Sequence, residues 1–161
     1  MGTAELIEIL RAEARDADEE LEAVARRIAA HLPDEPLTEE WILEVLRPLQ
    51  PLEAVRVFRL LAELGRMEWV GIAERMLAGA DAFVRLRLAD VLLTAKSGKA
   101  PATLRELYYG HRDRKDGKDR VTVDWIIEAL HEHEGDESAD ALRREIVAEE
   151  RARYEARRKT S

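Results

Sequence analysis

Apolar residues recur every three to four positions along most of this chain, and the few Pro and Gly residues stand mostly between such segments. That spacing gathers the apolar side chains on one side of a helix, and it predicts a series of amphipathic helices. A strand pattern of alternating apolar and polar residues is missing from the sequence, and Val121 to Val123 is long enough only for a short bridge. The sequence therefore predicts an all-α fold, a compact bundle of about seven to eight helices.

Capping residues and helix breakers give the expected start of each helix. These starts are Thr3, Thr38, Pro51, Met67, Asp81, Thr103, Thr122 and Ser138. The first helix is expected to be long, with its apolar stripe continuing to Ile28. The charged segment 149–159 has little to bury, and we expect it to fray or to await a partner. We predict an acidic helical bundle over residues 1–98 and a helix-turn-helix-like, three-helix unit over 99–161, or one continuous domain.

Charge is distributed unevenly along a chain whose net charge is −8. Residues 1–83 contain 9 basic and 18 acidic side chains, whereas residues 84–120 contain 10 basic and 5 acidic ones. The overall acidity argues against a general nucleic-acid coating protein, because the phosphate backbone is bound mainly by Lys and Arg. The basic middle of the chain is the exception, and it is the expected seat of function.

The composition excludes chemistry that depends on cysteine and argues against secretion and membrane insertion. The chain has no cysteine, so it lacks thiol catalysis, disulfides and thiolate zinc sites. It shows neither a signal-peptide pattern nor an apolar run long enough to cross a bilayer. We therefore expect a soluble, cytoplasmic protein that does not bind membranes.

The basic middle contains the candidate nucleic-acid-binding residues. They are Lys99, Arg105, Arg112, Arg114, Lys115, Lys118 and Arg120. A helix capped at Thr103, with Glu106 completing the capping-box pattern, is followed by a polar loop and another helix. That order is typical of a DNA-binding unit related to the helix-turn-helix, with a longer loop than usual.

The segment Thr103-Leu104-Arg105-Glu106-Leu107-Tyr108-Tyr109 resembles the tyrosine motif of the topoisomerase VI A subunit family, and the resemblance covers residues 84–146. In that family the second tyrosine attacks a DNA phosphodiester, which implies Tyr109 as the nucleophile and Arg105 as a phosphate contact. In that family, acidic residues of a separate α/β domain bind the Mg²⁺ ion, and this sequence has no counterpart of that domain. The family's apolar stretch after the tyrosines is replaced here by His111 to Lys115. The resemblance therefore implies at most one half of a split enzyme.

Other patterns favour structural roles. The segment 113–124 contains Asp and Gly residues like those of a calcium-binding loop. When it is aligned on Val121, however, Trp125 stands at the position where the loop needs a bidentate Glu. His131 and His133 are two residues apart and do not share a helix face. We therefore interpret them as residues of an ordinary exposed helix end rather than as metal ligands. Tyr108 is expected to pack inward with Tyr109 on the rim. The three tryptophans, Trp41, Trp69 and Trp125, are expected in the core.

The sequence leaves three functions open. The first is a non-catalytic helical adaptor that binds nucleic acid through residues 99–120 and protein partners through its acidic helices. The second is the tyrosine-bearing half of a split topoisomerase-like transesterase, and the third is a purely protein–protein interaction module. We expect a protein partner, with nucleic acid as a further candidate, and neither a cofactor nor a bound metal.

Overall fold

The computed structural model describes residues 2–16, 20–113 and 123–160, and all regular secondary structure within them is helical. The helices are α1 (Thr3–Arg15), α2 (Leu21–Ala29), α3 (Glu39–Leu46), α4 (Pro51–Glu63), α5 (Val70–Met76), the 3-10 turn η1 (Leu77–Gly79), α6 (Ala82–Thr94), α7 (Lys99–His111), α8 (Val123–His131) and α9 (Glu137–Thr160). The predicted all-α fold is confirmed. None of the described helices is long and apolar enough to cross a membrane.

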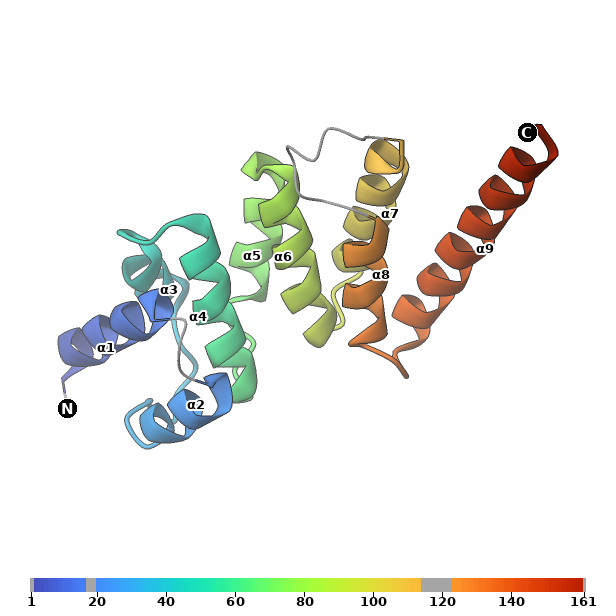
Figure 1. Cartoon of the computed structure of the whole chain (residues 1–161). Coiled ribbons are helices and arrows are strands. Elements are labelled where there is room, and N and C mark those ends of the chain that lie inside the picture. Colours follow the sequence, from blue (N-terminus) through green and yellow to red (C-terminus); the bar gives the residue numbers. More distant parts are fainter. Residues whose placement is uncertain (1, 17–19, 114–122, 161) are drawn as a thin grey trace.

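The helices follow one another across the molecule, with the N-terminus at one end and the C-terminus at the other (Figure 1). Helices α1 and α2 pack on α4, α3 packs on α1, and α4 in turn packs on α6. Helices α7 and α8 come next, and α9 closes the row by packing on both of them. One continuous set of buried apolar residues extends through the row, from Leu6 in α1 to Ile146 in α9.

Several helix ends form where the sequence predicts them. Thr38 accepts a hydrogen bond from the backbone N–H of Trp41 (3.1 Å), and Asp81 accepts one from Val84 (2.9 Å). Pro51 is the first residue of α4. Gly65 ends the same helical segment with a φ of 73°, a conformation that glycine adopts without steric cost.

Some helix boundaries differ from the prediction, and α5, for example, begins at Val70 rather than at Met67. The expected long first helix is wrong, because α1 ends at Arg15 and α2 begins at Leu21. The sequence between them is rich in Asp and Glu, and the repulsion between their charges and the low helix propensity of Asp favour a break. The break lets both helices pack on α4.

The expected helix start at Thr103 is also wrong. Helix α7 begins at Lys99, and Thr103 lies buried inside it, with 7% of its surface exposed. Pro101 falls in the first turn of this helix, where backbone N–H groups have no intrahelical partner and proline is tolerated. A capping-box pattern thus occurs within a helix whose start is set four residues earlier.

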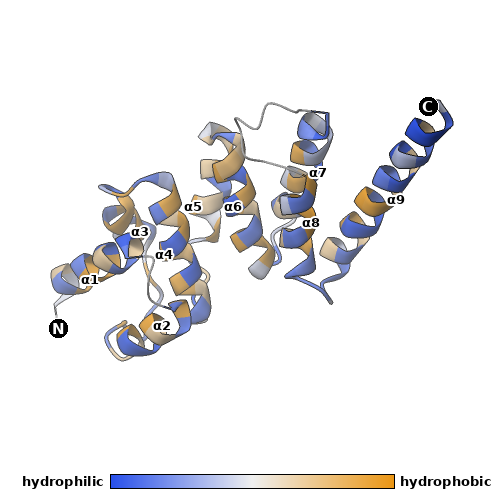
Figure 2. Cartoon of the chain, in the orientation of Figure 1, coloured by the Kyte–Doolittle hydropathy of each residue, from blue (hydrophilic) through white to orange (hydrophobic). Residues whose placement is uncertain are grey.

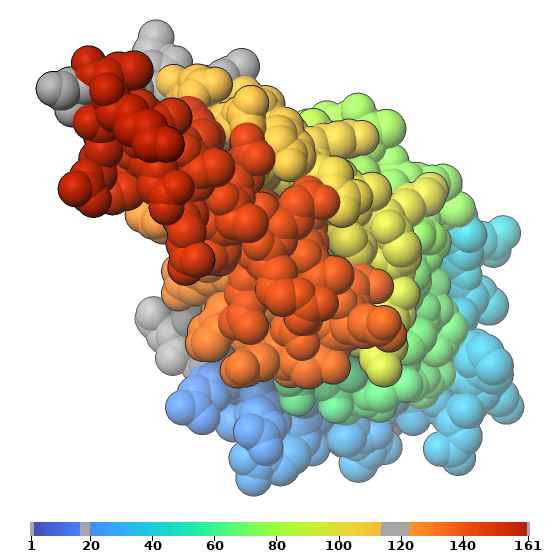
Figure 3. Space-filling model, turned by 90° about the vertical axis from the view of Figure 1, so that its right-hand side faces the viewer, coloured from blue at the N-terminus to red at the C-terminus, as the bar shows by residue number. Residues whose placement is uncertain are grey.

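Helix α9 is apolar only in its first half. Ala139, Leu142 and Ile146 are buried against the rest of the molecule, and none of the described residues after Ile146 is buried. The charged segment 149–159 is helical throughout, and the ribbon of this part of α9 has mostly the colour of hydrophilic residues in Figure 2. Figure 3 shows α9 lying across the end face of the molecule, where it covers part of α7.

Candidate binding surfaces

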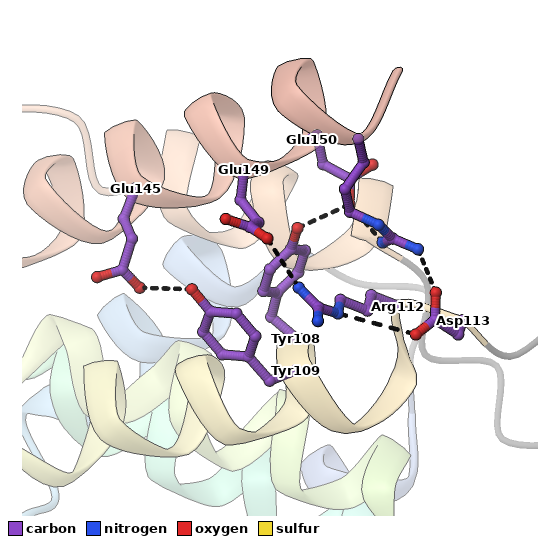
Figure 4. A network of polar contacts seen from close by, with 8 residues as sticks. Tyr108, Tyr109, Arg112, Asp113, Glu145, Glu149 and Glu150 are labelled. Carbon is purple, nitrogen blue, oxygen red and sulfur yellow. Dashed lines mark hydrogen bonds and ion pairs between the residues drawn. The ribbon is translucent and has the colours of Figure 1, made fainter. Parts of the chain in front are cut away.

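The C-terminal half of α7 faces α9 through a network of tyrosines, arginines and glutamates (Figure 4). Arg105 forms two hydrogen bonds with Glu145, from Nε at 3.0 Å and from Nη2 at 3.1 Å. One turn of α9 further on, Arg112 donates from Nη1 to Glu149 (3.0 Å). Two of the predicted phosphate-binding arginines are therefore already paired with carboxylates of the same chain.

The two tyrosines of the motif lie in this network but in different surroundings. Tyr108 is fully buried and donates its hydroxyl to Glu150 (2.7 Å), whereas Tyr109 is 42% exposed and lies 3.4 Å from Glu145. The burial of Tyr108 and the exposure of Tyr109 agree with the prediction. The guanidinium of Arg112 lies over the Tyr109 ring, 5.1 Å from its centroid.

The network makes both phenols harder to ionise. Desolvation, followed by the hydrogen bond to Glu150, raises the pKa of Tyr108 to about 12. Desolvation and the negative charge of Glu145 raise the pKa of Tyr109 above its ordinary value. A nucleophilic hydroxyl needs the opposite, a nearby base or a lowered pKa. The hydrogen bond from Arg105 lowers the pKa of Glu145, which further reduces its capacity to accept a proton.

Of the other predicted nucleic-acid-binding residues, the structure describes only Lys99. Lys99 is exposed at the first position of α7, away from the turns that hold Arg105 and Arg112. Arg114, Lys115, Lys118 and Arg120 lie outside the described residues, as do the expected cap Thr122 and most of the calcium-loop-like segment. Among the residues that the structure describes, no three His, Asp or Glu side chains gather as metal ligands would.

A second surface, which the sequence did not predict, is a hollow on the face formed by α4, α6 and α8. Its volume is about 440 Å³. It is lined by Leu52, Val55, Arg56 and Arg59 from α4, Phe83 and Arg87 from α6, and Trp125 from α8. We call these seven residues the basic apolar groove.

The apolar side chains of this groove are unusually open to solvent. Leu52 is 45% exposed and Trp125 is 42% exposed, although both stand on helices whose other apolar residues form the core. Trp125 packs edge to face on Phe83, with ring centroids 5.6 Å apart. The prediction of a core position is right for Trp69, which is fully buried, but wrong for Trp125.

The three arginines of the groove differ in how firmly they are held. Arg56 donates from Nε to the backbone oxygen of Glu13 (2.9 Å), and Arg59 donates from Nη2 to Asp90 (2.8 Å). The Nε of Arg59 is buried and makes no hydrogen bond within the described part of the chain. Arg87 forms no ion pair with any described residue. Arg87 thus leaves the groove with hydrogen-bonding capacity toward an anionic group.

No known protein family, curated protein or solved structure matched this chain.

A buried carboxylate supports the groove from beneath. Asp90 in α6 is 5% exposed and lies between Arg59 and His133, whose Nε2 is 3.1 Å from Asp90 Oδ1. These three residues connect α4, α6 and the segment after α8. His133 is therefore partly buried and partnered, rather than part of an ordinary exposed helix end. In the sequence, this buried cluster is indicated only by an aspartate that stands among the apolar residues of α6.

Proposed function

We propose that this chain is a non-catalytic helical adaptor that binds a partner protein through the basic apolar groove. The observation that supports the proposal is the pair of exposed apolar side chains, Leu52 and Trp125, placed beside arginines in one hollow. Tryptophan and arginine are the residue types that most often dominate the energy of protein interfaces. The proposed contact would lie on the face of α4, α6 and α8, rather than on the acidic N-terminal helices that the sequence suggested for protein partners.

The transesterase alternative has less support. Both tyrosines that resemble the family motif have raised pKa values and hydrogen-bond to glutamates. Among the described residues, the groups at the two hydroxyls are these glutamates. Desolvation and their negative charge raise the tyrosine pKa values and so disfavour a phenolate near neutral pH. If the alternative were correct, incubation with DNA, Mg²⁺ and a candidate partner chain would produce a covalent adduct that Tyr109→Phe abolishes.

The nucleic-acid alternative rests on Lys99 and on the charge of residues 114–120. Phosphate binding by Arg105 or Arg112 would first have to displace Glu145 or Glu149. A DNA and RNA titration at two salt concentrations tests it. Tight binding that falls steeply with salt, and that disappears when Arg112, Arg114, Lys115 and Lys118 are changed to Ala, would favour this alternative.

The proposed function is tested by affinity purification from the cells that produce the protein. Wild type and two variants, Trp125→Ala and Tyr154→Ala, are compared by quantitative mass spectrometry. Tyr154 is a matched control because it is an aromatic residue, 59% exposed, on the distant half of α9. We expect a protein that co-purifies with wild type and with Tyr154→Ala but is depleted about tenfold or more with Trp125→Ala. Equal recovery with both variants would contradict the proposal.

A further inference from the structure

The charge of the basic apolar groove is opposite to that of the whole molecule. The chain has a net charge of −8, yet the groove gathers Arg56, Arg59 and Arg87 around its apolar floor. A negatively charged partner segment is repelled by most of the surface and attracted at this point. Such local complementarity selects the partner and accelerates its association more than apolar contact alone does.

The groove is also polarised across its width. Trp125 and Arg87 line a neighbouring hollow as well, and there the other lining residues include Asp90, Glu128 and Glu132. Of these two hollows, Arg56 and Arg59 line only the first, Glu128 and Glu132 line only the second, and Arg87 and Trp125 lie between them. An occupant with acidic residues along one edge fits the groove only with that edge over α4 and α6.

The space beside Trp125 sets the size of the occupant's apolar part. The hollow of about 440 Å³ is floored by Leu52, Val55 and Phe83 as well as Trp125. A volume of this size accommodates one or two bulky side chains, and apolar anchors of that kind on one helix face are a common way for a peptide to occupy a groove.

From these three features we infer that the groove binds an acidic amphipathic helix of a partner protein. One or two large apolar side chains of that helix enter between Leu52, Phe83 and Trp125. Its Asp or Glu residues, one turn away, accept hydrogen bonds from Arg87. The inference rests on the proposed function and specifies the chemistry of the partner.

A displayed library of random peptides, selected for binding to the full chain, tests this chemistry without knowledge of the natural partner. We expect enriched peptides to combine Asp or Glu with Leu, Phe or Trp at helical spacing. Their binding should fall about 30-fold with Trp125→Ala and about tenfold with Arg87→Glu. Tyr154→Ala and Arg151→Glu are the matched controls, because both change the exposed surface of α9 far from the groove.

The outcomes separate the inference from the proposed function. Enriched peptides that need Trp125 but lack acidic residues, or that are unaffected by Arg87→Glu, would overturn the inference and leave the groove as a protein-binding surface. Binding that is insensitive to Trp125→Ala, or no enrichment at all, would overturn both. Thermal unfolding followed by circular dichroism verifies that each variant is folded.

Discussion

At the scale of single residues, Tyr108 belongs to a segment that resembles a catalytic motif, yet its role is to stabilise the fold. Its ring is fully buried between α7 and α9, and its hydroxyl donates to Glu150. A buried hydroxyl needs such a partner because an unsatisfied one costs about 1–3 kcal/mol. The same surroundings hold the proton on the phenol, so the residue that resembles part of a catalytic motif acts as a link between two helices.

This link predicts a loss of stability at high pH. The pKa of Tyr108 is about 12 in the folded chain, and the ordinary value for an unfolded chain is about 10. The stabilising contribution is therefore complete below about pH 10 and is lost as the pH rises toward 12, by up to about 3 kcal/mol. The free energy of unfolding, measured by urea titration from pH 9 to 12, should decline less steeply for Tyr108→Phe than for wild type.

The matched control for this measurement is Tyr154→Phe, since Tyr154 is 59% exposed near the end of α9. Its pH profile should follow that of wild type. If Tyr108→Phe also follows the wild-type profile, the hydroxyl does not hold its proton more tightly in the folded state.

At the scale of an element, α9 is attached to α7 through two kinds of contact. Leu142 and Ile146 supply buried apolar surface, while Glu145 and Glu149 pair with arginines along the rim of the contact. The arginine–glutamate pairs are partly exposed, so each contributes about 0.2–1 kcal/mol. They determine the register of α9 on α7 more than the total stability.

A charge exchange tests that register. Glu145→Arg places two guanidinium groups together and should lower the free energy of unfolding by about 1 kcal/mol. Adding Arg105→Glu restores an opposite-charge pair, and the double variant should recover most of the loss in chemical denaturation.

The control is Glu155→Arg, which makes the same charge change on α9 where no described residue pairs with the glutamate. It should leave stability nearly unchanged. A double variant no more stable than Glu145→Arg alone would contradict the pairing of Arg105 with Glu145.

The elements themselves were largely predictable from sequence, because caps and apolar spacing act locally. Thr38, Asp81 and Gly65 mark helix ends as expected. The start of α7 was not predictable in this way, since Thr103 and Glu106 satisfy a capping pattern inside the helix. Tertiary packing favours the earlier start, because α7 packs closely on α6 and Ala100 in the first turn of α7 is fully buried.

At the scale of the whole molecule, Asp90 holds three parts of the chain together. It is one of two buried polar residues in the described part of the chain, and it contacts both Arg59 and His133. Removal of a buried carboxylate leaves its cationic partner without compensation, which costs about 3–5 kcal/mol for a fully buried pair. Arg59 is about one-third exposed, so water recovers part of that cost.

We therefore expect Asp90→Ala to lower the free energy of unfolding by about 2 kcal/mol. Asp90→Asn, which keeps an acceptor oxygen at nearly the same place, should cost less. Chemical denaturation of both variants measures the difference. If Asp90→Ala is as stable as wild type, the contacts with Arg59 and His133 do not support the groove.

The candidate sites were harder to predict than the helices for a physical reason. Arg105 and Glu145 are 40 positions apart in the sequence, and the Arg59–Asp90 pair spans 31. Helical spacing shows which residues share a face, but it does not show which face meets which. The basic residues of α7 therefore suggested phosphate binding, and Trp125 suggested the core, until the packing of the helices was known.

The serial arrangement of the helices has a consequence for how the protein is made. Helices α1 and α2 pack on α4, which ends at Glu63, and α3 packs on α1, while most later helices pack on close neighbours in the sequence. Contacts between residues near in sequence form quickly, because little loop-closure entropy opposes them. The N-terminal helices can therefore assemble on the ribosome before α9 is synthesised, and the tyrosine–glutamate contacts of α9 on α7 are among the last to form.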